Sequence, residues 1–247
     1  MLKVSRPMRP CQRFLSMSAP NHSLDVLYED NHLLVVNKPA LLPTMGVERS
    51  RSSLLQVAKD YVRRKYHKPG NVYLGIVSRL DAPVTGVVLL ARTSKAASRL
   101  SEAFRKRRVQ KIYWAVVGGT PDPRHGTLQH YLRKDERHRR VHATHANCPD
   151  AQLARLQYSV LSEQNDLSLL EVNLETGRKH QIRVQLSKLG HPILGDRKYG
   201  SPFEFPKGIA LHARVLEFRH PVRDEPLRLE APLPISWRQH RPTAPLV

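Results

Sequence analysis

Residues 73–91 read YLGIVSRLDAPVTGVVLLA, and this stretch decides how the middle of the chain folds. The apolar runs at 73–77 and 87–91 are short, as buried strands are. The turn between them carries one carboxylate, Asp81, in a very basic protein. We therefore expect Asp81 on a tight loop between two core strands. Aspartate and proline are common in turns, yet loops on a rigid scaffold also hold many catalytic groups, so these residues alone leave both roles open.

Helices and strands follow one another irregularly on both sides of this loop. Apolar runs bounded by turn residues predict strands at 33–36, 112–117, 156–161 and 167–174, the last two joined as a hairpin around 163–166. Apolar residues at helical spacing predict helices over 53–66 and 94–107, and a third around 182–189 that ends at Gly190. Because no regular βαβ alternation is present, the expected fold class is α+β.

The chain carries a large excess of positive charge. Its 41 lysine and arginine residues against 21 aspartate and glutamate residues leave a net charge of +20 and a pI of about 10.5. Such a surface attracts polyanions, whereas solubility alone needs a charge of only roughly 2 to 8 in a small domain. We therefore expect a nucleic acid as the partner. Binding to a membrane surface is disfavoured, because the basic segments lack a long apolar face.

A single folded domain accounts for most of the 247 residues. We expect this domain at 24–238, a basic and disordered arm at 1–23, and a short tail at 239–247; a transit peptide or a start at Met17 are alternatives for the arm. No apolar run approaches the roughly 18 to 20 residues that span a bilayer. Two cysteines, Cys11 and Cys148, cannot build a disulfide framework, which suits a reducing compartment such as the cytoplasm.

The densest charge run lies between Arg124 and His145 and has few apolar residues. We expect it to form an exposed insertion, at about 124–148, outside the core. Two interpretations stay open for this insertion. It is either a solvated, mobile loop or an arm that contacts RNA, with Arg137, Arg139 and Arg140 as the contacts.

Metal and nucleotide chemistry leave little trace in the sequence. The spacing of His138, His142, His145 and Cys148 could serve a zinc site. Many arginines crowd these residues, however, and no paired C-x-x-C motif supports them. The motifs G-x-x-x-x-G-K-[ST], G-x-G-x-x-G, H-E-x-x-H and G-x-S-x-G are missing. We therefore expect neither a metal nor a cofactor.

Five motifs, taken together and in this order, resemble the RluA-type family of RNA pseudouridine synthases over most of residues 26–233. They are YEDNHLLVVNKP at 28–39, SRLD at 78–81 with Gly86, KIY at 111–113, ETGRKHQIR at 175–183 and GHPILGDRKYG at 190–200. The resemblance implies a mixed, mostly antiparallel, bifurcated sheet around a central cleft with flanking helices. It also implies an enzyme that isomerises uridine in ribosomal or transfer RNA to pseudouridine. We expect this enzyme to act in the cytoplasm, as a monomer and without a cofactor.

The resemblance further implies a role for individual residues. Asp81 is the essential catalytic carboxylate, Arg183 pairs with it and aims it, and Tyr113 places its ring against the target uracil. Arg79 helps to open the RNA, because a stacked or paired uridine is out of reach of an enzyme. Further RNA contacts are expected from Lys38, Lys111, Arg178 and His180.

The chain departs from the family pattern at several positions. Ser78 stands where histidine is usual, Val84 and Thr85 replace the common Thr-Ser, and Leu41 occupies a frequent glycine position. None of these changes removes the acid, the tyrosine or the paired arginine, so catalysis stays the favoured interpretation. Two alternatives are a catalytically idle RNA-binding module of the same fold and a zinc-dependent RNA enzyme. The sequence leaves open which RNA and which uridine are modified.

Overall fold

A computed structural model describes residues 24–46 and 52–237. The arm expected at 1–23 and the tail expected at 239–247 lie outside the described residues. Three α-helices are present in the described part of the chain: α1 (Leu54–Lys65), α2 (Ser94–Arg105) and α3 (Gln181–Lys188). Two short 3-10 helices follow at Arg197–Tyr199 (η1) and Ile235–Trp237 (η2). Within these ranges, none of the helices has the length and apolar character needed to cross a membrane.

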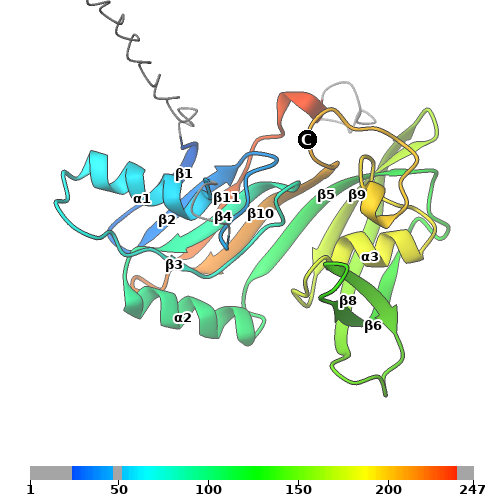
Figure 1. The fold of residues 1–247 in the computed structure, drawn as a ribbon, viewed down its shortest axis with the longest axis horizontal. Helices are drawn as coiled ribbons and strands as arrows, with labels where there is room; N and C mark the ends of the chain where they lie inside the picture. Colours follow the sequence, from blue (N-terminus) through cyan, green and yellow to red (C-terminus); the bar gives the residue numbers. More distant parts are fainter. Residues whose placement is uncertain (1–23, 47–51, 238–247) are drawn as a thin grey trace, which may run out of the picture.

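One sheet of 11 strands forms the centre of the fold (Figure 1). The strands are β1 (Val26–Glu29), β2 (Leu33–Lys38), β3 (Gly75–Ile76), β4 (Thr85–Ala91), β5 (Gln110–Gly118), β6 (His125–Asp135), β7 (Arg140–Thr144), β8 (Gln152–Gln164), β9 (Leu167–Leu174), β10 (Leu211–Arg219) and β11 (Pro226–Glu230). The main path runs β1-β2-β4-β10-β5-β9-β8-β6-β7, with β3 branching off β4 and β11 off β10. The α+β class and the mixed, bifurcated sheet are thereby confirmed.

The strand β10 joins the two halves of the sheet. It pairs in parallel with β4 and antiparallel with β5, whereas the other strand pairs are antiparallel. Its register sets Ala213 opposite Gly86, whose φ is +111°. A Cβ at Gly86 would lie 2.2 Å from the carbonyl oxygen of Ala213. Glycine is therefore required where β4 and β10 meet.

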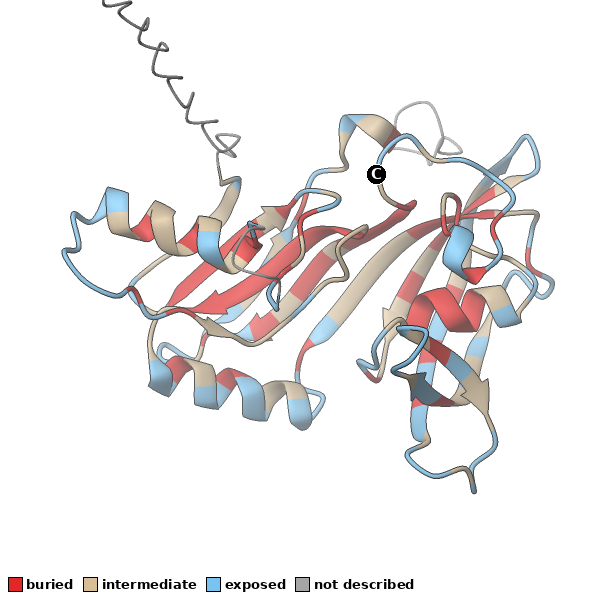
Figure 2. Ribbon diagram, viewed as in Figure 1, coloured by how far each residue is buried: buried red, intermediate tan, exposed pale blue. Residues whose placement is uncertain are grey.

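The helices cover different parts of the sheet (Figure 1). On one half, α1 packs Leu54, Ala58 and Val62 against one face of β2 and β4. Helix α2 packs Ala96 and Leu100 against the alternate residues of the same strands, and so covers the opposite face. Figure 2 shows buried residues along the central strands and exposed ones on the outer sides of both helices.

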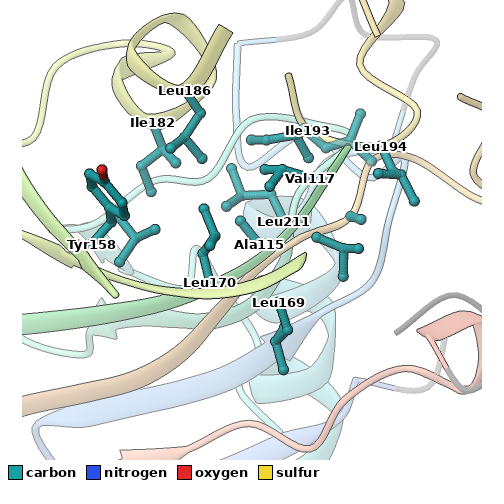
Figure 3. Close-up of a cluster of buried hydrophobic side chains, with 14 of the residues drawn as sticks. Ala115, Val117, Tyr158, Leu169, Leu170, Ile182, Leu186, Ile193, Leu194 and Leu211 are labelled. Atoms are coloured by element: carbon teal, nitrogen blue, oxygen red, sulfur yellow. The ribbon is translucent and has the colours of Figure 1, made fainter. Parts of the chain in front are cut away.

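Helix α3 covers the other half of the sheet. Its Ile182 and Leu186 point onto the cluster that includes Ala115, Tyr158 and Leu170 (Figure 3). This packing uses the apolar residues that predicted the helix. Because α3 lies on β5, β8 and β9 rather than on β2 and β4, its first turn lies beside the loop that follows β3.

Most predicted elements are confirmed. Ser53 and Thr93 cap α1 and α2 through their side chains, and the hairpin β8–β9 turns at Asn165 and Asp166, both in the left-handed region. The strand expected at 73–77 is only two residues long and half-buried. Its pairing with β4 still places Asp81 on the connecting loop.

The segment expected as an exposed insertion at 124–148 is largely exposed or half-buried, but most of it is regular sheet rather than a loop outside the fold. Its residues form β6 and β7, which extend the main sheet beyond β8. Leu132 and Val141 are buried with Tyr199 and Val184 of the α3 side in a small core of their own. The turn between the two strands is exposed, as are alternate residues along the first half of β6.

Candidate active site

A cavity of about 700 Å³ lies where the β3–β4 loop, β5 and the segment leading into α3 meet. Asp81, Tyr113 and Arg183 all line it, so the structure brings the three predicted catalytic residues together from distant parts of the chain. Four of the predicted RNA contacts line the same cavity: Arg79, Lys111, Arg178 and His180.

The loop that carries Asp81 is held on both sides by hydroxyl groups. Thr44 Oγ1 donates a hydrogen bond to the carbonyl of Leu80 at 2.8 Å and accepts one from its N–H at 3.1 Å. Ser78 Oγ accepts the N–H of Leu89 in β4 at 2.9 Å. Ser78, which departs from the usual histidine, thus fastens the loop to the neighbouring strand.

The predicted RNA contact by Lys38 is wrong. Its side chain is 0% exposed, and Nζ donates to the carbonyls of Pro39, Leu42 and Ala82 at 2.8, 2.7 and 3.1 Å. Burial lowers the pKa of Lys38 to about 7, although the nearby charge of Asp81 acts in the opposite direction. Lys38 therefore ties the segment after β2 to the Asp81 loop, and no RNA can reach it.

The guanidinium of Arg183 lies between two carboxylates. Its Nε and Nη2 donate to the two oxygens of Asp196 at 2.7 and 2.8 Å, and Nη1 donates to Oδ2 of Asp81 at 3.0 Å. Burial opposes the charge of Arg183, but hydrogen bonds and the charges of both acids raise its pKa above the usual value. A two-pronged contact to a buried partner fixes the plane of the guanidinium. Arg183 is thus a permanently charged, oriented donor to Asp81.

His180 approaches the same oxygen of Asp81. Its Nε2 lies 3.6 Å from Asp81 Oδ2, and its Nδ1 lies 2.7 Å from the hydroxyl of Tyr199. The carboxylate of Asp81 accepts hydrogen bonds but cannot donate them, so it favours the neutral imidazole that carries its proton on Nε2. Nδ1 then accepts the proton of the Tyr199 hydroxyl, whose oxygen also accepts the backbone N–H of Val141 at 3.0 Å. Burial lowers the pKa of His180 to about 4, which keeps the ring neutral at pH 7.

The contacts to Asp81 are one-sided. Both Arg183 and His180 face Oδ2, and within the described part of the chain Oδ1 has no hydrogen-bond partner. Tyr113 reaches the cavity from β5, and burial together with the charge of Asp81 raises the pKa of its hydroxyl. The site therefore offers an oriented carboxylate with one oxygen available to a substrate, beside an aromatic ring with a neutral hydroxyl.

The remaining predicted RNA contacts fall into two groups. Arg79 and Arg178 are exposed at the cavity. Arg137 and Arg139 are exposed at the β6–β7 turn, outside the cavity lining. Arg140 is half-buried, with its guanidinium 5.2 Å from the ring centre of Tyr199. The turn thus contacts the site indirectly, through Tyr199.

The histidines of the hypothetical zinc site contact other groups. His138 Nδ1 lies 2.7 Å from Asp135 Oδ2, and Cys148 Sγ lies 3.6 Å from Arg133 Nη1. Over residues 24–46 and 52–237, no group of three or more His, Cys, Asp or Glu side chains is placed to hold a metal ion.

Sequence reasoning missed the roles of Asp196 and Tyr199. Both belong to the matched motif at 190–200, but no spacing rule links η1 to the first turn of α3. Their burial, at 1% and 5% exposure, is the property that reveals their function as supports. The sequence does show an aspartate and a tyrosine on either side of two basic residues, at 196–199, and this is the feature that could have indicated their roles.

Comparison with known proteins agrees with this geometry. Residues 32–188 match the RNA pseudouridylate synthase family. The uncharacterized RNA pseudouridine synthase YhcT of Bacillus subtilis is 35% identical over 221 residues, which cover 87% of this chain and 70% of that protein. The ribosomal large subunit pseudouridine synthase D of Xylella fastidiosa is 37% identical, over 85% of this chain and 66% of the relative.

A solved structure shows the same fold. Human RNA pseudouridylate synthase domain containing 4 superposes with a TM-score of 0.72 at 30% identity, covering 86% of this chain and 91% of the human one. The matched family segment contains Asp81, Tyr113 and Arg183. Sequence, fold and the grouping of motifs around one cavity thus agree, and the chain belongs to the RNA pseudouridine synthase family, of the RluA type.

Proposed function

We propose that this protein converts uridine in RNA to pseudouridine and that Asp81 is the catalytic carboxylate. The observation that carries the proposal is the one-sided support of Asp81, in which Arg183 and His180 lie against Oδ2, while Oδ1 has no hydrogen-bond partner in the described chain and the residue lines the cavity. A carboxylate so held is already aimed when the substrate arrives.

The reaction exchanges one bond for another within the substrate. The bond from ribose C1′ to uracil N1 breaks, the uracil turns in the cavity, and C1′ forms a bond to C5. The hydrogen on C5 leaves and N1 gains a proton, so the product is an isomer of the uridine. Oδ1 of Asp81 either attacks C1′ or removes the 2′ proton; both steps require the ionised form.

The walls of the cavity match the remaining steps. The uracil stacks on Tyr113, and such a contact contributes roughly 1 to 3 kcal/mol. The hydroxyl of Tyr113, kept neutral by its raised pKa, takes part in the late proton transfers at C5 and N1. Arg79, exposed at the cavity, holds the RNA opened when the uridine leaves its stack.

The substrate, compartment and assembly are part of the proposal. Ribosomal RNA is the favoured substrate over transfer RNA, since the relative from Xylella fastidiosa is named for the large ribosomal subunit. The net charge of +20 supports a phosphate-rich partner. We place the enzyme in the cytoplasm, where such RNA is found, and propose that it acts as a monomer.

Release of tritium from RNA labelled at uracil C5 tests the proposal. The RNA is taken from a strain that lacks the gene, and the purified protein is compared with Asp81→Asn, which keeps the shape of the side chain but not its charge. We expect release by the unsubstituted protein and a loss of at least about 10³-fold in the variant. Equal release by both proteins would show that Asp81 is not the catalyst. Tight RNA binding without release would favour the idle RNA-binding module.

A further inference from the structure

A second groove of about 960 Å³ lies next to the active-site cavity. Its lining comes from the α2–β5 connection and from the ends of β9, β10 and β11. Phe104, Lys111 and Leu174 line both hollows, so they form a shared wall. The two hollows are therefore direct neighbours on the molecule.

The acidic residues in this groove are already paired. Glu217 Oε1 lies 2.8 Å from Arg228 Nε, and Glu175 Oε2 lies 3.3 Å from Arg155 Nε. Arg219 is likewise neutralised by Asp224 at 2.7 Å. The acidic side chains of the groove are thus not available to bind a cation. Among its basic side chains, Arg219 and Arg228 are already neutralised by acids.

Three cations in the groove have no such partner. Arg107, Arg108 and Lys111 form no ion pair with any residue in the described part of the chain. Lys111 Nζ has only a long contact, 3.4 Å, to the carbonyl of Thr176. Burial, and then the charge of Arg107, lower the pKa of Lys111 to about 8. The fold thus holds like charges together in a place where an anion would relieve their repulsion.

The backbone at Arg107 adds an independent observation. Its φ is +56°, and the N–H groups of Arg107 and Arg108 close the end of α2 onto Phe104 and Ala103. Glycine is the residue favoured at such a left-handed helix end, and a residue with a Cβ is disfavoured there by steric contact with its own backbone. An arginine at this position is unfavourable for the helix but places a charge at the groove.

We propose that the RNA strand on one side of the target uridine leaves the active-site cavity over Lys111 and lies in this groove, where Arg107, Arg108 and Lys111 bind its phosphates. This inference rests on the proposed function. Phe104, half-buried in the shared wall, presents an aromatic ring to the base next to the uridine. Unpaired cations beside an aromatic ring are typical of surfaces that bind single-stranded nucleic acid.

The test uses the double variant Arg107→Gln/Arg108→Gln, which removes two charges at exposed positions. The matched control is Arg64→Gln/Lys95→Gln, which removes the same charge from exposed positions on α1 and α2, away from both hollows. Two series of RNAs carry the target uridine and are lengthened one nucleotide at a time, either on its 5′ side or on its 3′ side. Dissociation constants are measured for each RNA over a range of salt concentrations.

We expect the double variant to lose about 10-fold or more in affinity in one series only, because the groove lies on one side of the cavity. The slope of log K against log salt should decrease by about 1.4 relative to the control, at about 0.7 per phosphate contact on a single strand. The loss should appear in Kd rather than in the rate at saturating RNA.

Equal affinities and slopes for the double variant and its control would overturn the proposal. So would an equal loss in both series, which would indicate general attraction rather than a groove that follows one strand. Because these measurements concern binding, they remain informative even if the unsubstituted protein releases no tritium, so failure of the groove and failure of the proposed reaction can be told apart.

Discussion

Asp81 depends on a chain of contacts that begins in another part of the sheet. The N–H of Val141 in β7 donates to the hydroxyl of Tyr199, which donates to His180, which in turn faces Asp81. Arg183 lies 5.0 Å from the ring centre of Tyr199. A single tyrosine thus supports both groups that hold the carboxylate.

The variant Tyr199→Phe tests this support. Without the hydroxyl, Nδ1 of His180 loses its donor and Val141 loses its acceptor, while the ring stays. We expect the imidazole proton to redistribute between the two nitrogens, a rate at saturating RNA lowered about 10-fold, and a stability loss of about 1 kcal/mol. Nitrogen-15 NMR of the imidazole reads the tautomer directly. An unchanged Nε2-protonated ring with a full rate would show that Tyr199 only fills space.

For single residues, the sequence identifies the reacting side chains but not the residues that hold them in place. Asp81, Tyr113 and Arg183 are found because each lies in a local motif, and the structure gathers them around one cavity. The residues around Lys38 give no sign that its side chain is buried, so the sequence alone favours an RNA contact there. Leu41, which departs from glycine, has a φ of +66°, so the chain keeps the left-handed turn there with a less favourable residue.

Among the elements, the contact between β4 and β10 constrains the site most. β4 follows the Asp81 loop directly, and its Gly86 faces the backbone of Ala213 at a distance that admits no side chain. Any separation of the two strands would shift the end of the loop. The position of the carboxylate therefore depends on a glycine five residues away.

We expect Gly86→Ala to lower the free energy of unfolding by about 3 kcal/mol or more, because the added Cβ meets backbone atoms and the φ is unfavourable for alanine. Chemical denaturation measures the loss. Gly70→Ala is the control, since a Cβ at Gly70 meets nothing within 4 Å, and its effect should be within about 0.5 kcal/mol. Similar losses in both variants would show that the close approach of the strands is relaxed easily.

The strands β6 and β7 show where sequence patterns are misleading. Along β6, half-buried and exposed residues alternate from His125 to His130, as expected for a strand on the sheet surface. The residues that alternate are histidine, threonine and glutamine as well as leucine, and charged residues follow them. Because few of these residues are apolar, the strand cannot be detected from hydrophobic periodicity. The helices, in contrast, have clear apolar faces and capping residues and were predicted to within about two residues.

For the molecule as a whole, two histidines whose pKa is lowered by burial should make folding sensitive to acid. His212 is 0% exposed, and its ring lies between the hydroxyl of Thr85 at 2.7 Å and the carbonyl of Ala231 at 3.2 Å. Burial lowers the pKa of His212 to about 4, as it does for His180. An unfolded histidine binds its proton near pH 6.5. Between pH 6.5 and 4 the unfolded state therefore binds more protons, and stability falls as the pH falls.

The variant His212→Gln isolates this effect. At pH 7 it should be less stable than the unsubstituted protein by about 1 to 3 kcal/mol, because buried hydrogen bonds are disturbed. As the pH falls towards 4.5, the unsubstituted protein loses the stability linked to His212. The gap in the free energy of unfolding between the two proteins should then shrink by on the order of 2 kcal/mol. Urea unfolding at several pH values measures the gap. A gap that stays constant would mean that His212 takes up a proton in the folded state near its ordinary pKa.

The place of β10 in the sheet has a consequence for how the enzyme is made. A ribosome synthesises β4 and β5 long before residue 211, yet these two strands lie on either side of β10 and pair with it rather than with each other. Until β10 has left the exit tunnel, the nascent chain has two unfinished sheet edges and no complete wall behind Asp81. Catalytic competence thus requires that residues 211–219 have been synthesised, and termination before residue 211 leaves a chain with the motif of the acid but without the strand that joins the two halves of its sheet.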